Sequence, residues 1–241
     1  MKEPCPNRGK DLVIEAGGGH YARLPVKTRL VKPKDRLAEI VRRYAVPHLL
    51  PGDLLFVSEK IVAITQGRAF PIEEIRPSRL ARFLVRFVYK SPHGIGLGSP
   101  WTMELALREV GAPRILFAAA LSALTKLCGI RGVFYLICGK RVAAIDGPCH
   151  YTIPPYNGYA KLGPAKPDRA ARELRDAAGV EVAIVDANDL GVALLGRSSR
   201  AISARFAREV FRDNPLGQSR EQTPLCIVRR VPGALARTGS D

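Results

Sequence analysis

The sequence is short of closely spaced cysteines, although it contains five cysteines among 241 residues. No CxxC pair occurs, so neither a zinc ribbon nor a disulfide framework is indicated. Cys128, Cys138 and Cys226 each stand in apolar surroundings. We expect these three to be small core residues, because free cysteine is among the residue types most often buried.

Long apolar runs are also absent. No run approaches the roughly 20 residues that cross a bilayer, and the polar first ten residues lack the apolar stretch of a signal peptide. We therefore expect a cytoplasmic protein with no membrane partner. Two common motifs are missing as well: there is no GxSxG nucleophile elbow, and the glycines of residues 93–100 fit neither a Walker loop nor GxGxxG.

Acidic residues are few: 22 Asp and Glu stand against 38 Lys and Arg, which gives a net charge of +16. Such an excess favours an anionic partner, and nucleic acid, nucleotide phosphates and a polyanionic cofactor are all candidates. Four basic residues line one side of a helix predicted over residues 79–90, either as a phosphate-binding stripe or as a solvated face. They are Arg79, Arg82, Arg86 and Lys90.

The residues that are present predict an α+β, or irregular mixed α/β, fold with mixed sheets and flanking helices, because strands and helices do not alternate strictly. We expect one folded domain over residues 21–231, a flexible leader over 1–20 and a frayed tail over 232–241. Buried strands are predicted at 54–57 and 182–185, and a final strand at 225–231. Two further apolar runs, 133–138 and 142–145, are predicted to pair as a hairpin.

Two aspartates each end a short apolar run and are followed by small or polar residues. Asp146 follows Val142-Ala143-Ala144-Ile145, and Asp186 follows Val182-Ala183-Ile184-Val185. Carboxylates delivered by buried strands are suitable ligands for a hard divalent cation, which in turn anchors phosphates. If the two strand ends meet, the chain is a metal–nucleotide enzyme.

Polar residues near these aspartates extend the prediction. Asn188 and Lys161 could hold phosphates and a developing acyl phosphate. The alternative for Asn188 is a turn before Gly191, which Asn and Asp favour. Both readings of Asn188 stay open.

Several segments together resemble the coenzyme F420-0 γ-glutamyl ligase family, over most of the chain from Leu24 to Val231. The segments are Leu24-Pro25-Val26, residues 52–62 with Gln66-Gly67-Arg68, Ala144-Ile145-Asp146, residues 184–188, and Gly217-Gln218 ahead of the last strand. The resemblance implies the unusual α/β fold that members of this family share, and an intertwined dimer. Its members join L-glutamate through an amide bond to a phosphate-bearing deazaflavin.

The resemblance implies a site as well as a reaction. GTP would be the co-substrate, and Mg²⁺ or Mn²⁺ would be the cofactor, held by Asp146 and Asp186. Lys161 and Asn188 would act in catalysis, through an acyl phosphate that an amine attacks. The residues implied to contact the nucleotide are Leu24, Pro25, Val26, Ser58, Lys60 and Gln218.

This chain departs from the family at several of these positions. Gln66 replaces the usual Glu, Ile64 stands where a Lys is usual, and Ala187 replaces a hydroxyl residue. Gln218 stands where an acidic residue is usual, so one cation site has lost an oxygen ligand. Two alternatives follow: a homologue that binds a nucleotide or another anion without ligating, and, ranked last, a nucleic-acid-binding protein. The loop over residues 154–161 has no counterpart in the family and could form a different substrate pocket.

Overall fold

The computed structural model describes residues 4–88, 96–130, 132–188 and 191–232. Two compact units are present, where the sequence predicted one domain. Unit 1 comprises Met1–Thr65 and Lys166–Asp241, and unit 2 is Gln66–Ala165. The chain is therefore a mixed α+β protein in which unit 2 is inserted into unit 1.

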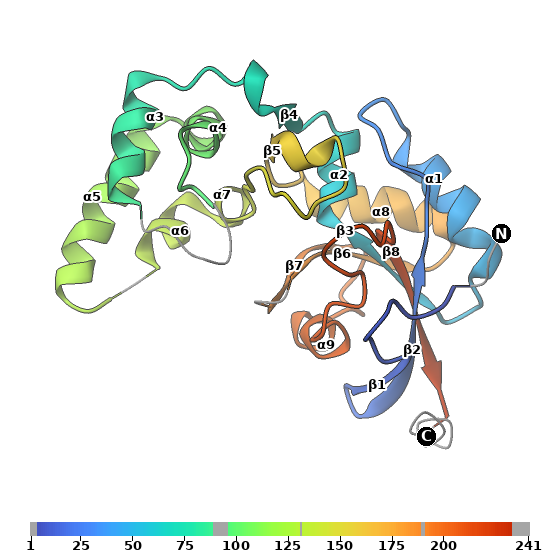
Figure 1. Cartoon of the computed structure of the whole chain (residues 1–241). Helices are drawn as coiled ribbons and strands as arrows, with labels where there is room; N and C mark the ends of the chain where they lie inside the picture. Colours follow the sequence, from blue (N-terminus) through green and yellow to red (C-terminus); the bar gives the residue numbers. More distant parts are fainter. Residues whose placement is uncertain (1–3, 89–95, 131, 189–190, 233–241) are drawn as a thin grey trace. The chain divides into compact units, whose positions relative to one another are not determined.

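Unit 1 is built on a six-stranded mixed sheet with the order β1-β2-β8-β3-β6-β7 (Figure 1). Its strands are β1 (Val13–Ala16), β2 (Gly19–Val26), β3 (Leu54–Ser58), β6 (Glu181–Asn188), β7 (Gly191–Arg197) and β8 (Leu225–Val231). Strands β3 and β6 are parallel, while the other neighbouring pairs are antiparallel. The strands predicted at 54–57, 182–185 and 225–231 are confirmed.

The central strands read as continuous apolar runs because both faces of the sheet are covered. One face packs on α9 (Ala204–Val210), where the ring of Phe56 stacks on Phe211 with centroids 4.6 Å apart. Alternate residues such as Leu55 and Val57 point to the other face and are fully buried. Helix α8 (Pro167–Ala178) packs on β6 and β7 and against α1 (Leu37–Tyr44) (Figure 1).

Helix α8 ends at Gly179, which has a left-handed φ of 75° that glycine adopts readily. The first turn of α8 packs close to a second glycine, Gly196 of β7. A Cβ atom built on Gly196 of β7 would lie 2.4 Å from the carbonyl carbon of Pro167. Glycine at 196 therefore lets the first turn of α8 approach the sheet closely.

The N-terminal residues belong to the sheet and are not simply a flexible leader. Strand β1 pairs with β2, and Asn7 donates two hydrogen bonds of 2.8 Å, to the carbonyl of Pro215 and the hydroxyl of Thr223. The sequence did not predict β1, because the residues around it are mostly polar and give no pattern of a buried strand. Of the predicted frayed tail, residues 233–241 lie outside the described residues.

Unit 2 is mainly helical, around a core that includes Met103, Leu105, Ile115 and Val142. Its helices are α3 (Arg79–Leu84), α4 (Pro100–Val110), α5 (Ala112–Leu127), α6 (Val133–Cys138) and α7 (Lys140–Ala143). A two-stranded sheet of β4 (Ala69–Pro71) and β5 (Tyr159–Lys161) accompanies them. Ser99 caps α4, in a capping box with Thr102.

The short elements complete the two units. Unit 1 also contains α2 (Glu59–Thr65) and the 3-10 helix η1 (Val46–His48). The 3-10 helices of unit 2 are η2 (Ile72–Glu74), η3 (Val85–Phe87) and η4 (Tyr156–Gly158). The helix predicted over residues 79–90 is thus α3 followed by η3, and Lys90 lies outside the described residues.

The hairpin predicted over residues 133–145 is wrong: these residues form α6 and α7. A short apolar run fits a buried helix as well as a strand, so the sequence pattern was ambiguous. Phe134, Ile137 and Cys138 face the unit 2 core at helical spacing, and Leu136 is left 82% exposed. Helical packing buries half of the run, which a hairpin without a neighbouring sheet would not do.

Two of the three cysteines predicted to be core residues are buried, Cys138 and Cys226. Cys128 is exposed, and that prediction is wrong. Its apolar neighbours lie on the C-terminal end of α5, which is itself exposed. Among the described residues no single helix is long and apolar enough to span a membrane; α4 and α5 pass that test only together, as a pair bent by 113°.

Candidate nucleotide and metal site

Asp146 does not end a strand, contrary to the prediction, because the preceding residues form α7. It makes an isolated bridge with Lys161, in which each backbone N–H donates to the other residue's carbonyl at 3.0 and 2.9 Å. The Asp146 carboxylate is 55% exposed. The bridge fixes its backbone and leaves its oxygens open to solvent.

Lys161, predicted to act with this aspartate, is brought beside it. Its side chain is only 7% exposed, and its ammonium nitrogen lies 3.8 Å from Asp146 Oδ2. The same nitrogen donates to the carbonyl of Ala144 at 3.3 Å. A buried ammonium next to a solvent-facing carboxylate can attract an anion and a cation to neighbouring positions.

The segment Gln66-Gly67-Arg68 makes hydrogen bonds to the residues that follow β5. The Gln66 side chain donates to the carbonyl of Ala165 at 3.0 Å and accepts from its N–H at 2.7 Å. Arg68 donates to the carbonyl of Gly163 at 2.6 Å and lies 2.9 Å from a carboxylate oxygen of Glu109. The sequence did not indicate this network, which holds the residues that follow Lys161.

In unit 1, Asp186 lies within β6 and does not end it. The strand continues to Asn188 because β7 pairs with it, Asp186 opposite Ala193 and Asn188 opposite Gly191. The run of four apolar residues gave no sign of this continuation. Asn188 is thus a strand residue and not the turn residue of the alternative, and residues 189–190 lie outside the described residues.

Ser58 lies at the end of β3, directly beside this part of β6. Its register partner is Val185, one residue before Asp186. Its N–H donates to the carbonyl of Pro224 at 2.8 Å, and its hydroxyl accepts from the N–H of Lys60 at 3.4 Å. Ser58 therefore stands between the strand and the first turn of α2, which carries Lys60.

A buried carboxylate in this turn escaped the sequence analysis. Glu59 is only 3% exposed, although it directly follows Ser58. Its position between a buried strand and an apolar helix is the signal that could have drawn attention to it. Charged residues are rarely buried without a structural or functional reason.

The segment Leu24-Pro25-Val26 ends β2 at the same edge of the sheet. Register partners run across four strands: Val26 pairs with Leu225, Leu225 with Val57, and Val57 with Ile184. The end of β2, the end of β3 and the Asp186 stretch of β6 therefore form one continuous edge. The parallel pairing of β3 and β6 explains why their carboxyl ends meet there.

Gln218 lies in the loop that leads from α9 to β8. Its side-chain nitrogen Nε2 is buried and has no hydrogen-bond partner in the part of the chain that the structure describes. The loop is tied to the end of β2 by a bond of 3.1 Å from the N–H of Thr28 to the carbonyl of Gln222. A buried N–H group without an acceptor is costly, so an oxygen of a ligand is a fitting partner.

The predicted residues thus fall into two groups, one in each unit. Asp146 and Lys161 are together in unit 2, and Ser58, Asp186 and Asn188 are on the sheet edge of unit 1. Within the described ranges no group of three or more His, Cys, Asp or Glu could hold a metal by itself. The donors at hand are carboxylate oxygens, the type that Mg²⁺ and Mn²⁺ prefer.

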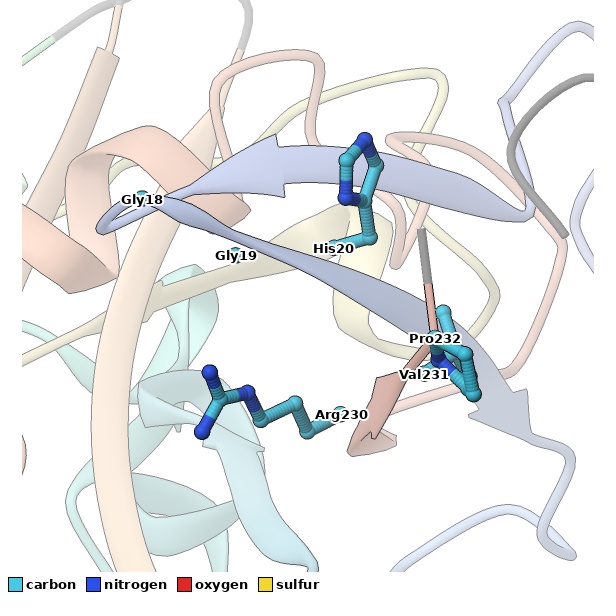
Figure 2. A pocket seen from close by; sticks show the side chains of 6 residues that line it. All are labelled: Gly18, Gly19, His20, Arg230, Val231 and Pro232. Atoms are coloured by element: carbon cyan, nitrogen blue, oxygen red, sulfur yellow. The ribbon is translucent and has the colours of Figure 1, made fainter. Parts of the chain in front are cut away.

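A surface pocket of about 490 Å³ lies at the other end of β2, lined by Gly18, Gly19, His20, Arg230, Val231 and Pro232. Figure 2 shows the His20 ring and the Arg230 guanidinium extending away from each other. The register explains this, because His20 pairs with Val231 and Tyr21 with Arg230, so His20 and Arg230 point to opposite faces. These groups do not converge on a ligand.

Comparison with known proteins gives a family match over most of the chain. Residues 25–203 match the family described as F420-0:Gamma-glutamyl ligase. A protein of Methanopyrus kandleri named coenzyme F420:L-glutamate ligase is 30% identical over 161 residues, which is 65% of this chain and 54% of that protein. The match therefore spans about half the length of that relative.

Proposed function

The chain belongs to the F420-0:gamma-glutamyl ligase family, and we propose that it is a nucleotide- and metal-dependent ligase that forms an amide bond with L-glutamate. The observation that carries the proposal is the sheet edge of unit 1. Three segments that are distant in sequence, around Val26, Ser58 and Asp186, meet there by strand register. Anionic ligands commonly bind beyond the carboxyl ends of parallel strands.

The proposed reaction has two steps. A carboxylate of a phosphorylated acceptor, such as the deazaflavin F420-0, attacks the terminal phosphorus of GTP, which gives an acyl phosphate and GDP. The amine of L-glutamate then attacks the acyl carbon, so that the amide bond forms and phosphate leaves. Stabilising the charge on the transferring phosphoryl group is the main catalytic requirement.

The residues have distinct parts in this proposal. The Lys161 ammonium would face a phosphoryl or acyl phosphate oxygen, and its contact with Asp146 fixes its position. Asn188 would donate its amide N–H to the developing charge. The segment Leu24 to Val26, Ser58, Lys60 and Gln218 would position the nucleotide. Asp186 in unit 1 and Asp146 in unit 2 would each offer carboxylate oxygens to a divalent cation, which would neutralise phosphate charge.

Titration calorimetry tests the nucleotide and metal parts together. We expect wild-type protein to bind GTP with Mg²⁺ or Mn²⁺, and Asp186→Asn to weaken that binding by about tenfold or more, because one carboxylate ligand is lost. Asp176→Asn is the matched control, since Asp176 lies on the exposed side of α8 and is 70% exposed. Equal affinities of wild type and Asp186→Asn would contradict the assignment.

A second candidate is a homologue that binds a nucleotide or another anion without ligating. Ile64 favours it, because this side chain is 3% exposed and so fills the core where the family carries a lysine. Incubation with GTP, L-glutamate and F420-0 separates the two candidates. Formation of the glutamyl product supports the ligase, whereas binding of GTP without release of GDP supports the second candidate.

The family resemblance also leads us to propose a homodimer. Light scattering of purified protein measures the mass directly, and a mass near twice 26.3 kDa is expected. A mass of one chain at micromolar concentration would overturn this proposal without affecting the ligase proposal.

A further inference from the structure

The exposed side of α3 and η3 carries arginines and phenylalanines together. We call these five residues the α3–η3 face: Arg79, Arg82, Phe83, Arg86 and Phe87. The arginines are those of the stripe predicted from the sequence, and the structure adds the two phenyl rings. Phe83 is 53% exposed and Phe87 is 74% exposed, which is unusual for side chains of this size.

The spacing of these residues places them on one side of the segment. They recur at intervals of three and four residues, which bring side chains to a common helix face. Ala81 and Leu84 lie on the other side and are buried in the core of unit 2. The segment therefore already has a buried face, and the two phenylalanines are not needed to complete it.

The two phenyl rings contact each other by an edge. Their centroids are 5.2 Å apart and the ring planes make an angle of 65°. An edge contact leaves flat ring surface uncovered, and both rings are more than half exposed. Flat aromatic surface in solvent is what a nucleobase stacks on, whatever the base is.

The charge of the face is not neutralised by neighbouring groups. In the part of the chain that the structure describes, no ion pair joins the three arginines to a carboxylate. Helix α4 packs beside α3 and carries Glu104, but this side chain is only 12% exposed (Figure 1). It accepts from the N–H of Ser78 at 2.9 Å and pairs with Arg108 at 3.0 Å. The arginines are thus available to a polyanion.

We propose that the α3–η3 face binds single-stranded nucleic acid. The guanidinium groups of Arg79, Arg82 and Arg86 would donate to backbone phosphates, for which the planar, forked donor set of arginine is well suited. The rings of Phe83 and Phe87 would stack on unpaired bases. This binding function is additional to the proposed ligase and does not rest on it, since all five residues belong to one segment of unit 2.

The arrangement of the side chains favours this partner over other anionic ones. A helix that lies on a lipid surface carries its apolar residues on one face and its basic residues on the opposite face. Here both kinds share one face, and the opposite face is buried. A duplex keeps its bases stacked inside, and a polyanion without bases would use only the arginines. A single strand uses both the arginines and the rings.

Fluorescence anisotropy with the full chain tests the proposal, with labelled oligothymidylate and oligouridylate of about 12 nucleotides as probes. We expect wild type to bind at low salt. Phe83→Ala/Phe87→Ala should bind at least about tenfold more weakly, with the same salt dependence, because stacking is lost. Arg79→Gln/Arg82→Gln/Arg86→Gln should lower the slope of log affinity against log salt by about 2, since each phosphate contact contributes about 0.7.

Two matched controls remove the same groups elsewhere. Phe117→Ala changes a phenylalanine of α5 that is 62% exposed. Arg42→Gln/Arg43→Gln/Arg172→Gln removes three exposed arginines of α1 and α8, and so the same amount of charge. Both should bind the probes with the affinity and salt slope of wild type. All substituted side chains are exposed, so the fold should be retained, as measured by circular dichroism.

Several outcomes would overturn the proposal. They are no binding by wild type at low salt, equal losses in the controls, and unchanged affinity of the phenylalanine variant. Inorganic polyphosphate that binds as tightly as the oligonucleotides would reduce the face to a site for any polyanion. If the phenylalanine variant instead converts a dimer to monomers, and wild type binds no oligonucleotide, the face belongs to a second copy. GTP affinity should be unchanged in every variant, so failure here is distinguishable from failure of the proposed ligase.

Discussion

Gln218 shows how one side chain can change the chemistry of a site. A carboxylate at this position would offer oxygen to a cation, whereas the amide offers a buried N–H group without a partner in the described residues. In the proposed site, the substitution would therefore exchange a carboxylate ligand for a hydrogen-bond donor. Such a donor can hold a phosphate oxygen directly, with less dependence on a metal.

We predict that Gln218→Glu strengthens the binding of Mg²⁺ or Mn²⁺ in the presence of GTP by about tenfold, because it adds a carboxylate ligand. Gln218→Leu removes the donor without adding charge and should weaken GTP binding by about fivefold, the effect of one hydrogen bond of about 1 kcal/mol. Titration calorimetry measures both. Unchanged metal affinity in the Glu variant would show that this side chain does not face the cation.

The cysteines give a second prediction at the scale of single residues. Burial raises the pKa of the Cys226 thiol to about 12, so its reactive thiolate is scarce at ordinary pH. Cys5 and Cys128 are exposed. An aromatic disulfide reagent should therefore label Cys5 and Cys128 rapidly in the native protein, and Cys226 only after denaturation, as mass spectrometry of the labelled peptides would detect. Rapid native labelling of Cys226 would contradict the buried central strand.

At the scale of elements, the contact between β7 and α8 requires glycine, which has no side chain, at position 196. Gly196→Ala would place a Cβ atom 2.4 Å from the carbonyl carbon of Pro167, where only backbone movement can make room. We expect a loss of about 1–3 kcal/mol in the free energy of unfolding, as in other overpacked sites. Gly158→Ala is the control, because nothing lies within 4 Å of its Cβ position. Urea denaturation compares the two, and equal midpoints would contradict the close approach.

Elements with strong local signals were predictable from sequence. The strands β3, β6 and β8 each contain four consecutive apolar residues. Ser99 marks a helix start through its side-chain cap, and Gly179 marks a helix end through its left-handed backbone. Residues 133–145 were not predictable, since six apolar residues bury equally well as a helix or as a strand. Packing of these residues against α4 and α5 favours the helical structure of α6 and α7.

The sequence named residues for the candidate site, but it did not predict how they are arranged in space. The resemblance named Ser58 and Asp186, but not that β3 and β6 are parallel neighbours, which is what brings them to one edge. Strand pairing between residues more than a hundred positions apart leaves no local pattern. Asp146 was misplaced for a related reason, because its bridge partner Lys161 belongs to β5, which pairs with the distant strand β4.

At the scale of the whole molecule, carboxylates set the response to acid. Burial alone would raise the pKa of Asp213, but hydrogen bonds and charge from the fully buried Arg23 outweigh it, and the pKa is lowered. The hydroxyls of Ser198 and Ser199 lower the pKa of Glu181, and Arg29 lowers that of Asp35. Lowered carboxyl pKa values indicate that the folded state binds fewer protons than the unfolded chain.

We therefore predict that stability is fully present above the unfolded carboxyl values of about pH 4 and falls as the pH drops through the lower folded values. Urea midpoints between neutral and acidic pH measure the slope. Asp213→Asn should reduce stability at neutral pH, because Arg23 loses its ionic partner, and should flatten the acid slope. Glu173→Gln, in an exposed pair with Arg169, should leave the slope unchanged. Rising stability toward acid would contradict the sign.

The insertion of unit 2 into unit 1 has a consequence for biosynthesis. Unit 2 is contiguous in sequence, so all of its residues are synthesised before β6 and β8 are translated. Until then β2 and β3 lack the neighbours that complete their sheet, and their apolar edges stay unpaired in the nascent chain. The order of synthesis therefore favours early folding of the inserted helices and late closure of the sheet.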